Sequence, residues 1–199
     1  MPQPQTLLSM AGVEARPHRL DDAAVVMIDA QNEYVDGRLA LPGVEDALRH
    51  GAALLAAARE RERPIVHVQH RGRPGGLFDP EGPAFRIADP VAPREGEGRV
   101  EKALPNAFAG TDLDALLRGT GAKALIVAGF MTHMCVSSTV RAAVDLGYGC
   151  TVLGPACATR DLPDGHGGVV AAADLHRAEL AGLADRFAML ADDVGQLAG

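Results

Sequence analysis

Short, unbroken apolar runs alternate with segments of helical periodicity along most of the chain. Residues 23–30 (AAVVMIDA) and 122–130 (AKALIVAGF) contain runs of Val, Ile, Leu and Ala that are typical of strands buried on both faces. Between them, residues 43–62 carry apolar side chains at helical spacing and end in charge. Because such strands need a helix layer above and below, the alternation predicts an α/β domain with a mainly parallel sheet. Right-handed crossovers make that sheet doubly wound.

The same reasoning divides the rest of the chain into expected elements. Residues 1–21 are expected to form an irregular lead-in, and residues 22–195 a single domain. Thr111 is expected to cap a helix that ends at glycine. Residues 71–98 are dense in Gly and Pro and are expected to form one long loop, a kind of segment that often carries function. The other expected strands are 64–70, 99–104, 149–156 and 186–191, and the other expected helices are 111–121, 133–147 and one within 165–185.

Composition narrows the classes of function. The 199 residues carry a formal net charge of −7, and the 19 Lys and Arg are scattered. This pattern disfavours nucleic acid and membrane surfaces as partners, since both select basic patches. No apolar stretch approaches the roughly 20 residues of a membrane span, and the first residues do not resemble a signal peptide. Three widely spaced cysteines do not suggest a disulfide framework. We therefore expect a cytoplasmic protein.

Three reactive side chains lie at or near the carboxyl ends of strands of the expected sheet. Ligands of doubly wound sheets bind beyond the carboxyl ends of the strands. Asp29 ends the first strand, Lys102 lies in the short strand 99–104, and Cys135 follows the strand that ends at residue 130. Each of these residue types also has a common role that is unrelated to catalysis. Asp often caps a turn, Lys is usually solvated, and Cys often fills space in a core. We expect the other two cysteines, Cys150 and Cys157, to fill the core in this way.

Cys135 differs because it stands at the first turn of an expected helix. Unpaired N–H groups and the positive end of the helix dipole lie near a side chain at that position. Helix N-termini and nearby cations lower the pKa of a thiol from about 8.5, so we expect a depressed pKa with help from Lys102. Asp29 can accept the thiol proton and return it to a leaving group. Backbone N–H groups at the turn can receive a developing oxyanion.

Three segments carry a resemblance to a known family. VVMIDAQNEY (25–34), VEKALPNAFAGTDLDALL (100–117) and IVAGFMTHMCVSSTVRAAVDLGY (126–148) resemble the isochorismatase-like cysteine hydrolases, which include nicotinamidases and carbamoylsarcosine amidases. The resemblance covers about residues 22–195. It implies a six-stranded parallel sheet with helices on both sides, a small-molecule substrate, no cofactor and a homo-oligomer of two or more subunits.

The resemblance also assigns roles to single residues. It implies a catalytic triad of Asp29, Lys102 and Cys135, and a cis peptide bond between Phe130 and Met131. The backbone N–H groups of Met131 and Cys135 would form the oxyanion hole. Gln31 is expected to support the loop after the catalytic Asp, and Thr132 the turn before the nucleophile. The expected pocket residues are Tyr34, Phe108, Phe130, Thr132 and His133, together with the loop 71–98.

One part of the family pattern is missing. Nicotinamidases hold a metal ion with Asp and several His that begin shortly after the catalytic Asp, but residues 30–39 (AQNEYVDGRL) contain no His. His67 and His70 remain, although the period of two places them on opposite faces of their strand. We therefore expect no metal site and no nicotinamidase activity, and leave open whether either histidine binds a metal. His166 and His176 are expected on helix surfaces or in hydrogen-bonded corners.

The retained thiol favours one reaction over two alternatives. Cys135 predicts hydrolysis of the C–N bond of a small amide through a thioester. A true isochorismatase cleaves a vinyl ether and need not use a thiol, so that activity is the first alternative. The second alternative is a binding or assembly protein that keeps the fold without turnover.

Overall fold

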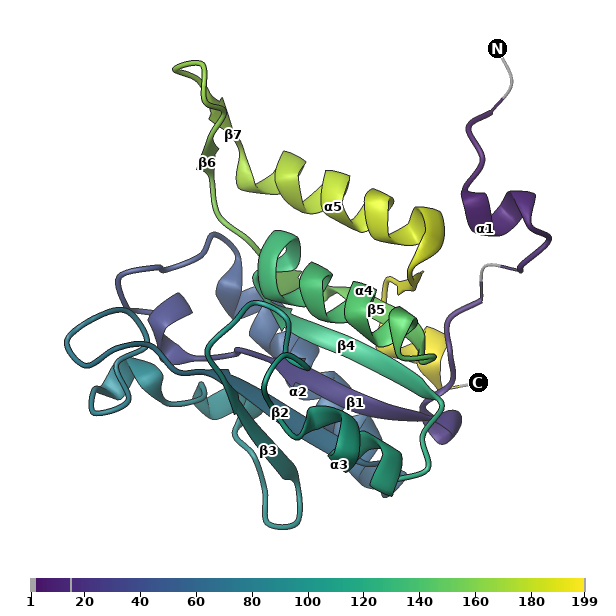
Figure 1. The fold of residues 1–199 in the computed structure, drawn as a ribbon, viewed down its shortest axis with the longest axis horizontal. Helices are drawn as coiled ribbons and strands as arrows, with labels where there is room; N and C mark the ends of the chain where they lie inside the picture. Colours follow the sequence, from purple (N-terminus) through teal and green to yellow (C-terminus); the bar gives the residue numbers. More distant parts are fainter. Residues whose placement is uncertain (1–2, 15, 199) are drawn as a thin grey trace.

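The computed structural model describes residues 3–14 and 16–198 and contains one six-stranded, all-parallel sheet (Figure 1). The strand order is β3-β2-β1-β4-β5-β8. This result confirms the predicted doubly wound sheet, and the direction of winding changes between β1 and β4. The strands are β1 (Ala23–Ile28), β2 (Ile65–His70), β3 (Gly98–Lys102), β4 (Ala124–Phe130), β5 (Gly149–Ala158) and β8 (Met189–Ala191).

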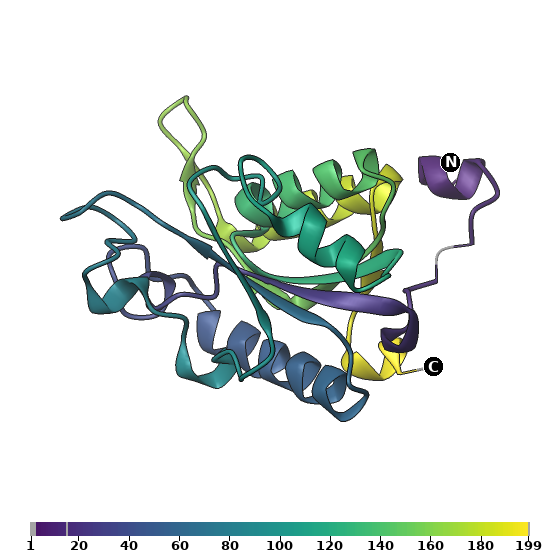
Figure 2. The ribbon, with the colours of Figure 1, turned by 60° about the horizontal axis from the view of Figure 1, so that its bottom comes forward.

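Helices cover both faces of the sheet (Figure 2). The helix α2 (Val44–Glu60) lies on one face, and α3 (Leu113–Gly119), α4 (Ser137–Asp145) and α5 (Ala172–Arg186) lie on the other. Within the described part of the chain, no helix has the length and hydropathy that a bilayer crossing needs.

Two apolar cores explain why the strands are unbroken apolar runs. In β1, Val25 and Met27 pack towards α2, whereas Val26 and Ile28 pack towards α3 and α4. All residues of β1 and β4 are buried. Each fully buried Val, Ile or Leu stabilises the fold by about 1.5–3 kcal/mol, so a strand between two helix layers gains from apolar residues at every position.

Two segments contain structure that was not expected. The lead-in holds a short helix, α1 (Leu7–Met10), whose Leu7 N–H donates to Asp185 Oδ1 of α5 at 2.8 Å. The other segment is a small antiparallel hairpin of β6 (Leu162–Pro163) and β7 (Val169–Val170), which projects from the body in Figure 1. Both elements are too short for hydrophobic periodicity to reveal them. Within the lead-in, residues 1, 2 and 15 lie outside the described residues.

The start of α3 corrects one prediction. The N-cap is Asp112 and not Thr111. The Thr111 hydroxyl donates to the Ala107 carbonyl and accepts from Leu113 N–H at 3.3 Å. Thr111 therefore closes the turn that precedes the helix, and the helix begins one residue later than a cap at this position requires.

The expected loop 71–98 spans the interval between β2 and β3 and contains two 3-10 turns, Pro83–Phe85 and Asp89–Val91. It is fastened to the sheet near the carboxyl end of β1. Ile87 forms a bridge with Gln31, and Ala88 N–H donates to the Ala30 carbonyl at 2.8 Å. The loop is therefore held beside the edge at which the predicted site lies.

Candidate active site

Asp29 follows β1 directly in a left-handed backbone conformation, with φ of 49°. Its N–H donates to the Val68 carbonyl and its own carbonyl accepts from Gln31 N–H, both at 2.8 Å. Left-handed residues other than Gly are uncommon and cost about 1–3 kcal/mol, although Asp tolerates the conformation better than most. The surrounding hydrogen bonds hold this turn, and the Asp29 side chain is completely buried.

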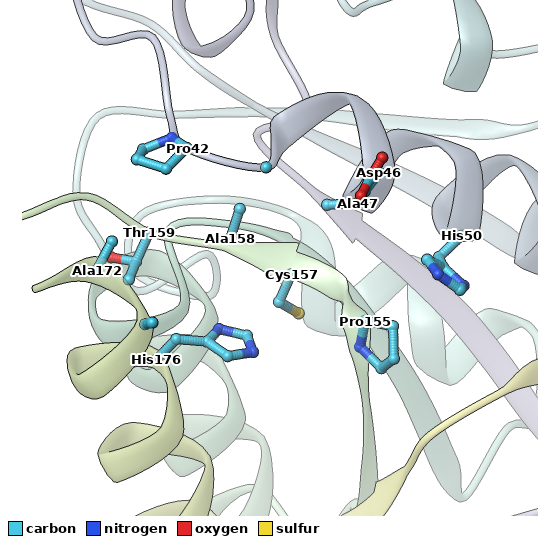
Figure 3. A pocket seen from close by; sticks show the side chains of 12 residues that line it. Pro42, Asp46, Ala47, His50, Pro155, Cys157, Ala158, Thr159, Ala172 and His176 are labelled. Carbon is cyan, nitrogen blue, oxygen red and sulfur yellow. The ribbon is translucent and has the colours of Figure 1, made fainter.

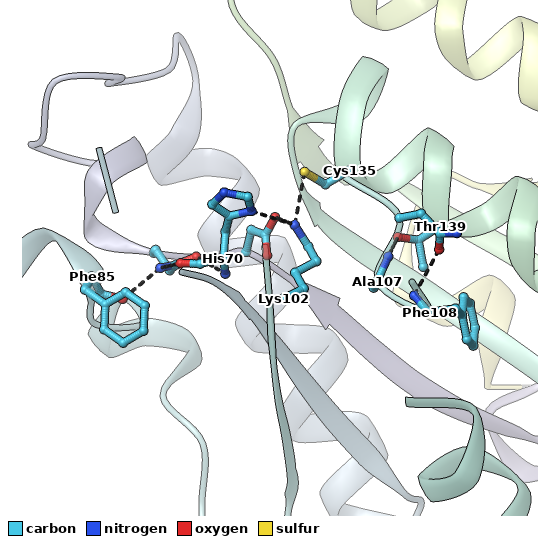
Figure 4. A network of polar contacts seen from close by, with 10 residues as sticks. His70, Phe85, Lys102, Ala107, Phe108, Cys135 and Thr139 are labelled. Atoms are coloured by element: carbon cyan, nitrogen blue, oxygen red, sulfur yellow. Dashed lines mark hydrogen bonds and ion pairs between the residues drawn. The ribbon is translucent and has the colours of Figure 1, made fainter. Parts of the chain in front are cut away.

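Lys102, the last residue of β3, joins three segments of the chain (Figure 4). Its Nζ lies 2.6 Å from Asp29 Oδ2, 3.3 Å from Cys135 Sγ and 3.1 Å from His70 Nδ1. The structure thus brings the predicted carboxylate, ammonium and thiol into one cluster. The exposed fractions of Asp29, Lys102 and Cys135 are 0%, 2% and 5%, so the cluster is shielded from bulk water.

Cys135 lies in a π-helical turn, Thr132–Val136, that continues into α4. The N–H groups of Met134 and Val136 both donate to the Met131 carbonyl, at 3.0 and 3.2 Å. The peptide bond between Phe130 and Met131 is cis. Single π turns are rare and occur often at functional sites. The sulfur on this turn lies 3.3 Å from Lys102 Nζ, at the carboxyl end of β3.

The pKa of Cys135 corrects a prediction. Burial raises the pKa of the thiol to about 12, and the neighbouring Asp29 carboxylate adds to the increase while Lys102 opposes it. The expected depression of this pKa is therefore wrong, because withdrawal of the thiolate from water outweighs the effect of Lys102. Burial also raises the pKa of Asp29 to about 6, against the opposing effect of Lys102. In the resting protein the proton stays on sulfur, and Asp29 is a stronger base than an exposed Asp.

Gln31 links the ends of two strands and the long loop. Its Nε2 donates to the carbonyls of His70 and Phe85, both at 2.9 Å, and its Oε1 accepts from His70 N–H at 2.8 Å. The side chain is fully buried and makes these hydrogen bonds two residues after Asp29. This arrangement fits the expected support of the Asp loop.

Thr132 supports the nucleophile turn from the side of β5. Its hydroxyl lies 3.1 Å from the Ala158 carbonyl, to which it donates, and 2.8 Å from His176 Nδ1. The neighbouring His133 contacts the Thr159 hydroxyl through Nδ1. Thr132 is buried and engaged with β5, so its position fits the expected support of the turn better than a pocket wall.

The expected aromatic pocket residues lie in different surroundings. Phe130 is buried in the core, and Tyr34 packs edge-on against Phe130 and Phe78, with ring centroids 5.7 and 5.1 Å apart. The ring of Phe108 stacks on that of Tyr148, with centroids 6.1 Å apart. In Figure 4, Lys102 lies between Phe108 and Phe85 of the loop 71–98. The charges of the cluster act on Tyr34: burial raises its pKa far above the usual value, and Asp29 and Cys135 add to the increase.

Two residues near the cluster were not predicted as site residues. His70 was considered only as a metal ligand, although its place at the end of β2 signals the same sheet edge. Arg160 follows β5, and its charge acts on the pKa values of both Tyr34 and His133. Among the described residues, neither Arg160 Nε nor His133 Nε2, both buried, has a hydrogen-bond partner.

The histidines of β2 do not fit a metal centre. His70 Nδ1 contacts an ammonium group, and His67 Nε2 contacts Glu97 Oε2 at 2.8 Å on the other face of the strand. Arg59 Nε holds the same carboxylate at 2.7 Å. No group of three or more His, Cys, Asp or Glu in residues 3–14 and 16–198 is arranged to hold a metal ion.

A cavity of about 460 Å³ lies between the first turns of α2 and α5 (Figure 3). Its walls include Ala47, Cys157, Ala158 and His176, but none of Asp29, Lys102 and Cys135. The cluster therefore does not open into this cavity.

Comparisons with known proteins agree with this fold and motif pattern. A family model for the isochorismatase domain matches residues 23–193. The crystal structure of an isochorismatase from Pseudomonas putida superposes with a TM-score of 0.93 and 46% identity, over 98% of this chain and all of that chain. An uncharacterized isochorismatase family protein of Bacillus subtilis is 42% identical over 70% of this chain and 79% of its own length. A secreted isochorismatase effector of Verticillium dahliae is 37% identical over 92% of this chain and 94% of its own length.

Other relatives carry names that specify an activity. A maleamate amidohydrolase of Pseudomonas putida is 30% identical over 63% of this chain and 67% of its own length. A ureidoacrylate amidohydrolase of Caulobacter vibrioides is 28% identical over 77% of this chain and 82% of its own length. A streptothricin hydrolase of Streptomyces noursei is 36% identical over 70% of this chain, which spans about half of that longer protein. From the family model, the shared fold and these relatives, we conclude that this chain belongs to the isochorismatase family of hydrolases.

Proposed function

We propose that this protein is a cysteine hydrolase that cleaves the C–N bond of a small amide, with Asp29, Lys102 and Cys135 as its catalytic triad. The observation that carries the proposal is the position of Lys102 Nζ, within 2.6 Å of Asp29 Oδ2 and 3.3 Å of Cys135 Sγ. A base, a cation and a sulfur nucleophile in one buried cluster form the constellation that covalent catalysis needs.

The first half of the reaction forms a thioester. Asp29 accepts the thiol proton as Cys135 Sγ attacks the amide carbon, because a thiol with a pKa of about 12 is almost fully protonated at neutral pH. Lys102 stabilises the sulfur while it carries negative charge. The N–H groups of Met131 and Cys135 receive the oxyanion. The C–N bond then breaks, and the proton on Asp29 passes to the leaving nitrogen, which departs as ammonia or an amine.

The second half releases the acid. Water attacks the thioester carbon, and Asp29 accepts its proton. The C–S bond breaks, the carboxylic acid leaves, and the proton returns to Cys135 sulfur. The raised pKa of Asp29, about 6, suits a group that both accepts and donates a proton near neutral pH.

The names of the relatives support amide cleavage over vinyl ether cleavage. Two of them are amidohydrolases, of maleamate and of ureidoacrylate, and both names denote a carboxylate. Arg160 offers a matching group here, since its buried Nε has no hydrogen-bond partner among the described residues. We include in the proposal that Arg160 binds a substrate carboxylate and that Tyr34 and His133 lie beside it. A guanidinium is well suited to a carboxylate because it can donate two parallel hydrogen bonds.

Ammonia release from a panel of small amides tests the proposal. The wild type is expected to hydrolyse at least one amide that carries a carboxylate, and Cys135→Ala is expected to abolish that turnover. Cys150→Ala is the matched control, because Cys150 is a buried thiol in the core below α4 and contacts none of the triad groups. Unchanged turnover in Cys135→Ala would reject the covalent route. Pyruvate release from isochorismate without ammonia from any amide would favour the vinyl ether alternative, and no turnover at all would favour a binding protein.

Arg160→Gln separates the substrate class from the reaction. The variant is expected to raise KM for the carboxylated amide and to leave an uncharged amide of similar size unaffected. Arg177→Gln on α5 serves as the control, since exposed Arg177 forms an ion pair with Asp174 and with no other acidic side chain among the described residues. An equal effect of Arg160→Gln on both amides would contradict the role in carboxylate binding.

A further inference from the structure

The environment of Lys102 contains one acceptor that the proposed mechanism does not use. An ammonium group has three N–H donors and no acceptor. Around Lys102 Nζ lie Asp29 Oδ2 at 2.6 Å, Cys135 Sγ at 3.3 Å and His70 Nδ1 at 3.1 Å. Three acceptor atoms therefore surround a group with three donors. Asp29 Oδ2 forms an ion pair with Lys102 Nζ, and Cys135 Sγ and His70 Nδ1 are in hydrogen-bond geometry with the same Nζ.

This contact defines the protonation of the imidazole. A charged Lys102 cannot accept a hydrogen bond, so His70 Nδ1 must present its lone pair and the ring proton must be on Nε2. Burial and, to a smaller extent, the charge of Lys102 together lower the pKa of His70 to about 4. The ring is thus neutral at neutral pH, and its acceptor faces the cluster.

The imidazole is held in this orientation from two sides. Gln31 fixes the backbone of His70 through both its N–H, at 2.8 Å, and its carbonyl, at 2.9 Å. The ring packs edge-on against Phe78, with centroids 5.0 Å apart. Phe78 is itself held by a hydrogen bond of 3.0 Å from its N–H to the buried carboxylate of Glu33. The acceptor is therefore part of a packed wall and not a mobile surface side chain.

We propose that His70 is a positioning residue for the reaction: its Nδ1 binds the third N–H of Lys102 and thereby keeps the other two directed at Asp29 and Cys135. This inference rests on the proposed function of the triad. The proposed role also explains why His70 lies on the face of β2 opposite His67, whose ring contacts the Glu97 carboxylate. Without an acceptor at this place, the buried ammonium is left with an unsatisfied donor and is free to rotate about its stem.

Two isosteric substitutions separate this role from packing. In His70→Asn, the amide Oδ1 stands the same number of bonds from Cα as His Nδ1 and restores the acceptor. In His70→Leu, a methyl group takes that place and no acceptor remains. We expect His70→Leu to lower kcat by about 10- to 100-fold with little change in KM, as for the loss of one hydrogen bond to a charged group, and His70→Asn to retain most of the wild-type kcat.

The alkylation rate of Cys135 by iodoacetamide at neutral pH gives a second readout that needs no substrate. Peptide mass mapping resolves Cys135 from Cys150 and Cys157. His70→Leu is expected to slow the alkylation of Cys135 by about tenfold, because the sulfur loses a correctly directed cation, and His70→Asn is expected to restore it. Circular dichroism and thermal unfolding verify that both variants are folded.

The outcomes separate the two proposals. Equal effects of Leu and Asn on kcat and on alkylation would overturn the role of His70, because the two side chains have nearly the same shape and only Asn offers Lys102 an acceptor. If the wild type hydrolyses no amide in the panel, the proposed function fails, and the alkylation rates still decide whether His70 positions Lys102. A variant that unfolds is replaced by His70→Gln, whose amide oxygen stands one bond further out, and that variant is expected to behave like His70→Leu.

Discussion

Lys102 Nζ and Asp29 Oδ2 lie 2.6 Å apart, and neither side chain is accessible to solvent. A buried ion pair is costly to break, because removal of one partner leaves the other charge unpaired in a medium that solvates it poorly. The pair therefore links the stability of the protein to the same atoms that we propose for catalysis.

Removal of the cation alone is expected to affect stability and activity together. Lys102→Met should lower the free energy of unfolding by about 3–5 kcal/mol, less any part that Asp29 recovers when it becomes protonated. It should also abolish amide hydrolysis. The double variant Asp29→Asn with Lys102→Met should regain much of the stability and none of the activity. Urea unfolding of the wild type, the Lys102→Met variant and the double variant measures these stabilities. A double variant as unstable as Lys102→Met would contradict the stabilising role of the ion pair.

The pH dependence of hydrolysis reports the proton acceptor. Because Asp29 must be ionised to take the thiol proton, kcat/KM should fall as the pH drops through about 6, the pKa to which burial raises this carboxyl. The profile should stay level just above neutral pH, where the acceptor is ionised and the thiol is still protonated. A profile that rises steadily from neutral pH into the alkaline range would instead indicate attack by a pre-formed thiolate.

A second ionic cluster, far from the thiol, should govern acid stability. Burial would raise the pKa of Glu97, but hydrogen bonds from Arg59, Arg94 N–H and His67 hold it at about 2. Because the folded pKa is below the unfolded one, this carboxylate stabilises the protein above about pH 4.5, and the contribution is lost as the pH falls towards 2.

Glu97→Gln tests this cluster. The variant should be less stable than the wild type at neutral pH. Its free energy of unfolding should then fall less than that of the wild type as the pH is lowered. Glu60→Gln, an exposed position at the end of α2, is the control and should follow the wild-type curve. Parallel acid-unfolding curves of the Glu97→Gln variant and the wild type would show that Glu97 does not carry the effect.

Gly129 occupies a position that no other residue fits. Its φ is 121°, and a Cβ there would lie 1.9 Å from the carbonyl oxygen of Ile28 in the neighbouring strand. Gly129→Ala should therefore destabilise the protein by about 4 kcal/mol or more, or prevent folding. Gly119→Ala, at the open end of α3, meets no atom within 4 Å and should be neutral or slightly stabilising. Thermal unfolding of both variants measures the difference, and equal stabilities would contradict the proposed clash.

The sheet was predictable from sequence because β1 and β4 are buried on both faces. Val25 and Val26 point into the two cores on opposite faces of the sheet, and both must therefore be apolar. The unbroken apolar run that results can be recognised in the sequence before the fold is known. The edge position of Asp29, Lys102 and Cys135 followed from the same topology. The hairpin β6–β7 was missed because two-residue strands carry no period, and the Thr111 cap was wrong because the helix begins at Leu113, one residue later than that cap requires.

Other features of the site depend on burial, which sequence spacing does not report. The thiol of Cys135 was expected to be acidic, and Lys102 does lower its pKa, but the loss of hydration dominates. His70 and Arg160 were overlooked because their roles arise from contacts between distant segments: the former with Lys102, the latter at the end of β5. The homo-oligomer and the cytoplasmic location stay predictions.

The mass of the Cys135 peptide after acid quench of a reacting mixture tests the covalent mechanism most directly. With an amide that the wild type hydrolyses, the account predicts a fraction of Cys135 that is heavier by the substrate minus its leaving amine. That mass should disappear when the substrate is exhausted. Full turnover with Cys135 always unmodified, together with wild-type rates in Cys135→Ala, would contradict the central claim.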